Sequence, residues 1–176
     1  MGSLGVVSLT LIDCRYPFEF RGGHIRGASN IYMPQQLEER FLSNPPTPSD
    51  NLNCCRDVVI FYCEMSSQRA PRVQNHLRNL DRSLHVSKYP ALSYPHIFLL
   101  DGGYRRFHSI FGCTDLCEPQ GYIQMRDPAF SEELRQSRGV AKGMELQRKR
   151  AKYNDPCARR LDGNGGRVRS LSMPSF

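Results

Sequence analysis

An apolar run that ends at a cysteine is the feature that most constrains the fold of this chain. Residues 58–62 are apolar, β-branched or aromatic, a pattern typical of a buried strand. Five mostly polar residues separate Cys63 from Arg69, after which apolar side chains recur at helical spacing. Pro71 suits the first turn of that helix, because the N–H that proline lacks has no helical partner there. The sequence therefore predicts a strand, a short loop and a helix in direct succession.

Such a loop would form an anion-binding site. Its backbone N–H groups and the helix N-terminus converge on one point, and the planar guanidinium of Arg69 can bind two oxygens of a tetrahedral oxyanion. The same positive field favours the thiolate form of Cys63, which is a nucleophile for phosphorus. The alternative is a buried cysteine at a strand end with an unrelated surface arginine. The predicted phosphate-binding residues are Glu64, Met65, Ser66, Ser67, Gln68 and Arg69.

Five further blocks of sequence accompany this loop in a fixed order over residues 11–134. The five blocks are Leu-Ile-Asp-Cys-Arg-Tyr-Pro-Phe-Glu-Phe at 11–20, Gly-Gly-His-Ile-Arg-Gly-Ala at 22–28, Tyr-Pro-Ala-Leu at 89–92, Leu-Asp-Gly-Gly-Tyr at 100–104 and Cys-Glu-Pro-Gln at 117–120. Together with the loop, these blocks resemble the catalytic domain of the Cdc25 phosphatases. The resemblance implies a rhodanese-like α/β fold, with a central parallel sheet flanked by helices. It also implies dephosphorylation of adjacent phosphothreonine and phosphotyrosine on cyclin-dependent kinases, which promotes cell-cycle progression.

The resemblance assigns roles to individual residues. Cys63 would form a phosphocysteine intermediate, and Arg69 would bind the phosphate. Glu64 is a candidate general acid, with a solvated loop carboxylate as the alternative. Asp13 would support the loop, and Cys14 would form a disulfide with an oxidised Cys63. No metal or other cofactor is expected, because the loop itself supplies the positive field.

The chain departs from the family pattern at three positions near the loop. Tyr62 stands where the family has histidine, Gln68 where it has a second glutamate, and Ala70 where it has glycine. Glutamine cannot donate a proton as an acid, so the acid role falls to Glu64 or to the substrate itself. The family also has a helix and a strand before the residue that corresponds to Asp13, and their absence here predicts an uncovered sheet edge.

The expected protein partner is a kinase–cyclin complex. The resemblance assigns docking to Arg78, Arg82 and Tyr89, and a contribution to the basic residues 148–150. At the end of the chain, the Arg-Ser-Leu-Ser-Met-Pro motif looks like a 14-3-3 docking site with Ser172 as the phosphorylated residue.

Charge divides the chain into two parts. Residues 135–176 contain eleven Lys or Arg against three Asp or Glu, whereas the remainder contains thirteen against fourteen. We therefore expect a catalytic domain at 1–134 and, at 135–176, a basic helix followed by a disordered tail. No aromatic residues interleave with the basic run, and no apolar run is long enough to span a bilayer. We expect no nucleic-acid or membrane partner, a monomeric state, and a location in nucleus and cytoplasm.

The remaining pattern predicts the other elements of a parallel α/β sheet. Strands are expected at 9–12 and 97–100, helices at 37–42, 69–82 and 130–147, and irregular structure over 108–128.

Three other functions share this fold or loop. A sulfurtransferase typically has a shorter loop, so the five-residue gap here favours phosphate. An arsenate reductase remains open because arsenate mimics phosphate. A kinase-binding pseudophosphatase, which would bind the kinase–cyclin complex without efficient catalysis, remains open because of Tyr62 and Gln68.

Overall fold

The computed structural model describes residues 8–48 and 57–154 of the 176-residue chain, with side chains described up to residue 147. It divides into two compact units, Met1–Ser137 and Arg138–Phe176. The expected separation of a catalytic domain at 1–134 from a basic segment at 135–176 stays a prediction. Ser172 and the side chains of residues 148–150 lie outside the described part.

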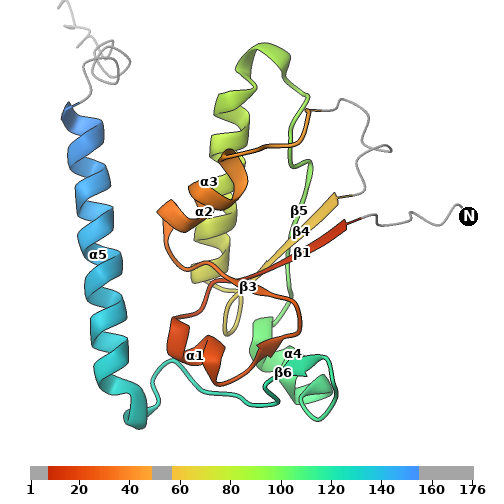
Figure 1. Cartoon of the computed structure of the whole chain (residues 1–176), viewed down its shortest axis with the longest axis vertical. Helices are drawn as coiled ribbons and strands as arrows, with labels where there is room; N and C mark the ends of the chain where they lie inside the picture. Colours follow the sequence, from red (N-terminus) through yellow and green to blue (C-terminus); the bar gives the residue numbers. More distant parts are fainter. Residues whose placement is uncertain (1–7, 49–56, 155–176) are drawn as a thin grey trace, which may run out of the picture. The chain divides into compact units, whose positions relative to one another are not determined.

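A four-stranded parallel sheet forms the centre of the first unit (Figure 1). Its order is β3-β1-β4-β5, and β1 pairs with β4 along its whole length. The parallel α/β sheet predicted from the sequence is confirmed. Its strands are β1 (Ser8–Asp13), β3 (Ser29–Asn30), β4 (Asp57–Tyr62) and β5 (His96–Leu99). A small antiparallel pair joins β2 (His24–Ile25) to β6 (Cys117–Glu118).

Helices follow most of the strands. The helices predicted at 37–42, 69–82 and 130–147 are confirmed, each with somewhat different bounds. They are α1 (Pro17–Arg21), α2 (Pro34–Leu42), α3 (Arg69–Leu84), α4 (Gly103–Phe111) and α5 (Ser131–Asn154), with short 3-10 turns at Val86–Lys88 and Pro128–Phe130. Among the described residues, no helix has both the length and the apolar character needed to cross a bilayer.

Helix α4 corrects the prediction of irregular structure from residue 108 onward. The Gly-Gly pair after Asp101 looked like the end of a strand and the start of a loop. In the structure Gly102 adopts a left-handed conformation and caps the new helix at its N-terminus. Tyr104, Phe107 and Phe111 then recur at helical spacing.

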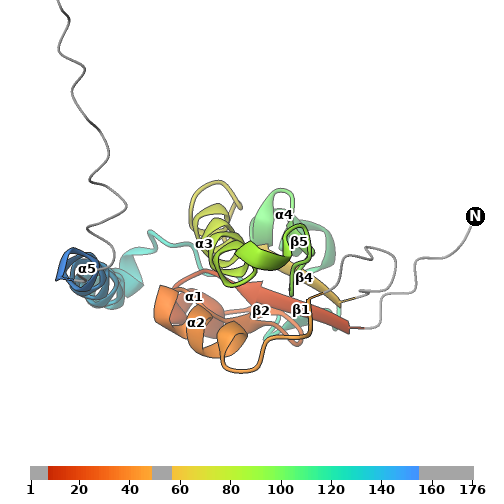
Figure 2. The same ribbon diagram turned by 90° about the horizontal axis from the view of Figure 1, so that it is seen from above.

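The main core lies where α2 and α3 pack against the sheet. Ile12, Phe61 and Ile97 from three strands cluster with Leu37 of α2 and Leu77 of α3. The two views show α3 running alongside the central strands (Figures 1 and 2). This packing fixes the N-terminus of α3 beside the end of β4, and so fixes both ends of the loop between them.

A second cluster gathers residues from β2, β4, α4 and β6. Tyr62 of β4, Ile25 of β2, Tyr104 of α4 and Cys117 of β6 form its buried centre. Among the described strands, β5 is an edge, and its Phe98 side chain is 51% exposed. The uncovered edge that the resemblance implies stays a prediction, because β3 and β5 are the ordinary edge strands of an open sheet.

Gly103 allows α4 to approach the loop closely. Its φ is +60°, and a Cβ at this position would lie 2.4 Å from the carbonyl oxygen of Cys63. The approach lets the N–H groups of Tyr104 and Arg105 donate to the carbonyls of Cys63 and Glu64, each at 2.9 Å. Helix α4 thus supports the first two residues of the loop from behind.

We predict that Gly103→Ala lowers the free energy of unfolding by about 3 kcal/mol, because the variant combines backbone strain with a steric clash. Gly27→Ala is the matched control, since Gly27 also has positive φ but a methyl group added there would have no neighbouring atom within 4 Å. It should lose only about 1 kcal/mol. Urea unfolding measures both values, and equal losses would show that the close approach of α4 is unimportant.

Candidate active site

Cys63 follows the last residue of β4 directly, and Arg69 is the first residue of α3. The predicted order of strand, loop and helix is therefore confirmed. Between them, Ser66 adopts a positive φ of 54° that turns the chain back toward the helix. The Ser66 hydroxyl is buried and has no hydrogen-bond partner in the described part of the chain.

Arg69 is held by a buried carboxylate. Both of its terminal nitrogens bond to Glu19, one of them at 3.0 Å, and Glu19 has a fully buried side chain. Glu64 lies 3.7 Å away on the same guanidinium, and the ring of Tyr16 packs against it. Burial acts to lower the pKa of Arg69, but Glu19, Cys63 and Glu64 together raise it above its usual value. The arginine is therefore a permanent cation within the electrostatic range of Cys63.

Glu19 is a residue of the candidate site that the sequence did not reveal. It lies in the 11–20 block, where it also accepts the N–H of Tyr16 at 2.9 Å in a capping box at the start of α1. The Tyr-Pro-x-Glu order is a recognisable signal for that cap. No local signal indicates that the same carboxylate also reaches Arg69, 50 residues away.

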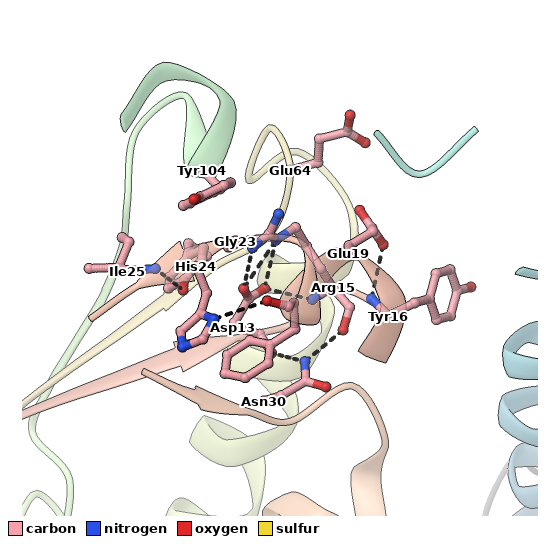
Figure 3. A network of polar contacts seen from close by, with 12 residues as sticks. Asp13, Arg15, Tyr16, Glu19, Gly23, His24, Ile25, Asn30, Glu64 and Tyr104 are labelled. Atoms are coloured by element: carbon pink, nitrogen blue, oxygen red, sulfur yellow. Dashed lines mark hydrogen bonds and ion pairs between the residues drawn. The ribbon is translucent and has the colours of Figure 1, made fainter. Parts of the chain in front are cut away.

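A buried ion pair beneath the loop involves Asp13 (Figure 3). Arg15 donates to both Asp13 oxygens, at 3.0 and 2.7 Å, and to the carbonyl of Gly23 at 2.6 Å. Its guanidinium lies between Asp13 and the ring of Tyr104, 4.0 Å from the ring centroid. Asp13 therefore reaches the loop through Arg15 and α4, which is compatible with the supporting role predicted for it.

Cys14 lies at the end of the neighbouring strand, where its N–H donates to the carbonyl of Tyr62 at 2.7 Å. Its side chain is buried, and both Cys14 and Cys63 are free thiols. Burial, reinforced by the charges of Asp13 and Cys63, raises the pKa of the Cys14 thiol well above its usual value. Cys14 is therefore a neutral thiol near Cys63, and its redox role stays a prediction.

Glu64 and Tyr62, the residues on either side of the nucleophile, have different surroundings. Oε1 of Glu64 accepts the hydroxyl of Tyr122 at 2.8 Å, a contact that the sequence analysis did not foresee. Tyr62 is fully buried, and its hydroxyl accepts the N–H of Ile25 at 3.2 Å. Burial, together with Asp13, raises the pKa of Tyr62, so this residue is a neutral packing side chain.

The three predicted docking residues are not equally available. Arg78 donates to the carbonyls of Tyr94 and Pro95, at 2.7 and 3.0 Å, and burial lowers its pKa. Arg78 therefore helps to hold the segment after α3. Arg82 is exposed, and Tyr89 is 65% exposed.

Comparison with known proteins identifies the class first. The rhodanese-like domain family matches residues 2–110, so the chain belongs to that family. The resemblance to Cdc25 phosphatases is confirmed by relatives within that class. An M-phase inducer phosphatase of Drosophila melanogaster is 44% identical over 142 residues, 78% of this chain and 29% of the relative. Human M-phase inducer phosphatase 3 is 44% identical over 138 residues, 78% of this chain and 28% of the relative.

The chain thus spans less than a third of the length of these two relatives. Solved structures with a similar fold include an As-Sb reductase from Leishmania major, with a TM-score of 0.47 and 22% identity over 63% of this chain and 71% of that one. Another is yeast Ygr203w, described as a protein tyrosine phosphatase of the rhodanese family, with a TM-score of 0.46 and 21% identity over 66% of this chain and 78% of that one.

We predict that Glu19→Gln lowers the free energy of unfolding by about 3 kcal/mol, because a largely buried guanidinium loses its fully buried counter-charge and keeps only the 3.7 Å contact with Glu64. Glu133→Gln is the matched control, since Glu133 forms an exposed ion pair with Arg21. The control should lose less than about 1 kcal/mol. Chemical denaturation of both variants checks the difference, and a small loss for Glu19→Gln would contradict the role assigned to this carboxylate.

Proposed function

We propose that this chain is a cysteine-dependent dual-specificity protein phosphatase that acts on cyclin-dependent kinases and promotes cell-cycle progression. The observation that carries the proposal is the loop itself. Cys63 directly follows β4, and Arg69 begins α3 at the other end of the loop, where Glu19 holds the guanidinium with a bond of 3.0 Å. The similarity to M-phase inducer phosphatases supports the choice of substrate.

The proposed reaction has two steps. The sulfur of Cys63 attacks phosphorus, and the bond from phosphorus to the threonine or tyrosine oxygen breaks as the sulfur–phosphorus bond forms. Glu64 gives its proton to the departing oxygen. Water then attacks the phosphocysteine, releases phosphate and returns a proton to Glu64. Arg69 and the backbone N–H groups of the loop stabilise the phosphoryl oxygens in both steps, because these donors are in position before the substrate binds.

Cys14 is proposed as the thiol that protects the nucleophile. If peroxide oxidises Cys63 to a sulfenic acid, the Cys14 thiol can displace water from it and form a disulfide. The proximity of the two residues supports this role, since they directly follow the paired residues Asp13 and Tyr62 and both belong to the main core cluster. A reductant would later restore both thiols.

Recognition of the kinase–cyclin complex is proposed to involve the end of α3 and the turn after it. Arg82 and Tyr89 are exposed there. Arg78 contributes through its grip on the 94–95 backbone.

Further proposals follow from the sequence motifs and the family. Phosphorylated Ser172 would recruit a 14-3-3 protein, and the basic residues 148–150 would add to kinase binding. The protein would act as a monomer in nucleus and cytoplasm, without a metal or cofactor.

We predict hydrolysis of 4-methylumbelliferyl phosphate by the chain, with a loss of at least about 10³-fold in Cys63→Ser because serine is a far weaker nucleophile at neutral pH. Cys113→Ser is the control, since Cys113 is an exposed thiol outside the loop. Fluorimetric initial rates measure both. Glutathione-dependent arsenate reduction without phosphate release would instead indicate an arsenate reductase, and kinase–cyclin binding without hydrolysis would indicate a pseudophosphatase.

Reversal of one charge tests the docking surface. Arg82→Glu should lower kcat/KM on a phosphorylated kinase–cyclin complex at least about tenfold, because like charges across an interface repel. Its rate on the small aryl phosphate should stay at the wild-type value. Arg40→Glu, an exposed arginine on α2, should change neither rate. Steady-state kinetics on both substrates decide, and an equal loss on the two substrates would remove Arg82 from docking.

A further inference from the structure

Tyr122 contacts the candidate general acid from a segment beyond the part of the chain that matches the rhodanese-like family. It lies in irregular chain after β6, whereas the family match ends at residue 110. Its hydroxyl donates to Oε1 of Glu64 at 2.8 Å. The other oxygen, Oε2, is the one that lies 3.7 Å from Nη2 of Arg69. The two carboxylate oxygens of Glu64 are therefore in different environments.

Tyr122 is held in the same frame as the nucleophile. Its ring stacks on His108 and tilts against Tyr104, with centroids 5.6 and 6.0 Å apart. The hydroxyl of Tyr104 donates to the carbonyl of Gly121 at 2.8 Å, and the N–H of Tyr104 donates to the carbonyl of Cys63 at 2.9 Å. One residue of α4 thus connects the Tyr122 segment to the base of the loop.

The Tyr122 hydroxyl remains a hydrogen-bond donor at neutral pH. Burial, together with the hydrogen bond to and the charge of Glu64, raises the pKa of Tyr122 above its usual value. The phenol therefore keeps its proton at neutral pH and donates it in the hydrogen bond to the carboxylate oxygen that faces it.

We propose that Tyr122 is a positioning residue that selects the oxygen of Glu64 from which the leaving group receives its proton. This inference rests on the proposed phosphatase function. Because Oε1 accepts the Tyr122 hydrogen bond, Oε2, on the side of Arg69, is the oxygen that carries the proton in the proposed acid step. Without Tyr122 the carboxyl group can rotate, and both oxygens carry the proton in turn.

The proton balance of the two steps is complete. As the bond between phosphorus and the leaving oxygen breaks, the proton on Oε2 passes to that oxygen and Glu64 becomes a carboxylate. Tyr122 continues to donate to Oε1. When water attacks the phosphocysteine, Oε2 accepts the water proton and the starting state returns.

The experiment is a leaving-group series with the variant Tyr122→Phe. The full chain is assayed on phenyl phosphate, whose leaving group needs a proton, and on 4-nitrophenyl phosphate, whose leaving group departs as an anion. Loss of an oriented acid should reduce kcat/KM for phenyl phosphate by roughly tenfold. The rate for 4-nitrophenyl phosphate should change less than about twofold, because that reaction gains little from an acid.

Two further variants distinguish a positioning role of Tyr122 from a general effect on folding. Tyr94→Phe removes another tyrosine hydroxyl with a 2.8 Å bond, to the carbonyl of Phe41, and should leave both rates unchanged. Glu64→Gln removes the acid itself, so adding Tyr122→Phe to it should cause no further loss on phenyl phosphate.

The outcomes distinguish the inference from the function beneath it. Three results would each overturn the role of Tyr122 while leaving the phosphatase function intact. They are equal losses of kcat/KM on the two substrates, wild-type kcat/KM on phenyl phosphate in Tyr122→Phe, and additive losses of kcat/KM in the double variant. Failure of the wild-type chain to hydrolyse either ester would overturn the proposed function, and this inference with it.

Discussion

The ion pair between Asp13 and Arg15 is the interaction on which the site depends. Both side chains are fully buried, and burying two charges is unfavourable unless they are paired and hydrogen-bonded. Nε and Nη2 of Arg15 donate to Asp13 and the Gly23 carbonyl, and the guanidinium lies against the ring of Tyr104, whereas Nη1 has no hydrogen-bond partner among the described residues. The end of β1, the turn before β2 and the first turn of α4 are thereby joined at one point. The N–H groups of that first turn donate hydrogen bonds to the carbonyls of Cys63 and Glu64. The position of the loop therefore depends on the ion pair beneath it.

A second charge pair sets the electrostatics of the loop. Glu19 is fully buried, whereas its partner Arg69 keeps about a fifth of its side chain exposed. The carboxylate therefore fixes the guanidinium from the protein side and leaves part of it open to a ligand. This arrangement favours an oxyanion, because a cation held in place before binding needs no reorganisation when the ligand arrives. Glu64 lies 3.7 Å from the same guanidinium, so the candidate proton donor for a leaving group stands beside the cation that would bind the oxyanion.

The sequence predicted those parts of this arrangement that local pattern encodes. The apolar run before Cys63 and the helical spacing after Arg69 were enough for the strand, the loop and the helix. Helix α4 was missed because a Gly-Gly pair is common in turns, and the need for Gly103 arises from the loop that it packs against. The contacts from Glu19 to Arg69 and from Tyr122 to Glu64 join residues 50 and 58 positions apart. Only the tertiary fold brings such pairs together, so no spacing rule could have found them.

Two of the departures from the family pattern near the loop bear on whether catalysis is retained. Tyr62 replaces histidine, but its ring lies in the second core cluster and its hydroxyl bonds to the N–H of Ile25. Gln68 is exposed at the N-cap of α3. Among the described residues, the contacts of the Arg69 guanidinium come from Glu19, Glu64 and Tyr16 and so do not involve the two changed positions. The changed positions therefore affect packing and capping, whereas the thiol, the cation and one carboxylate are all kept. That distribution supports the proposed phosphatase over the alternative of a domain that would only bind a kinase–cyclin complex.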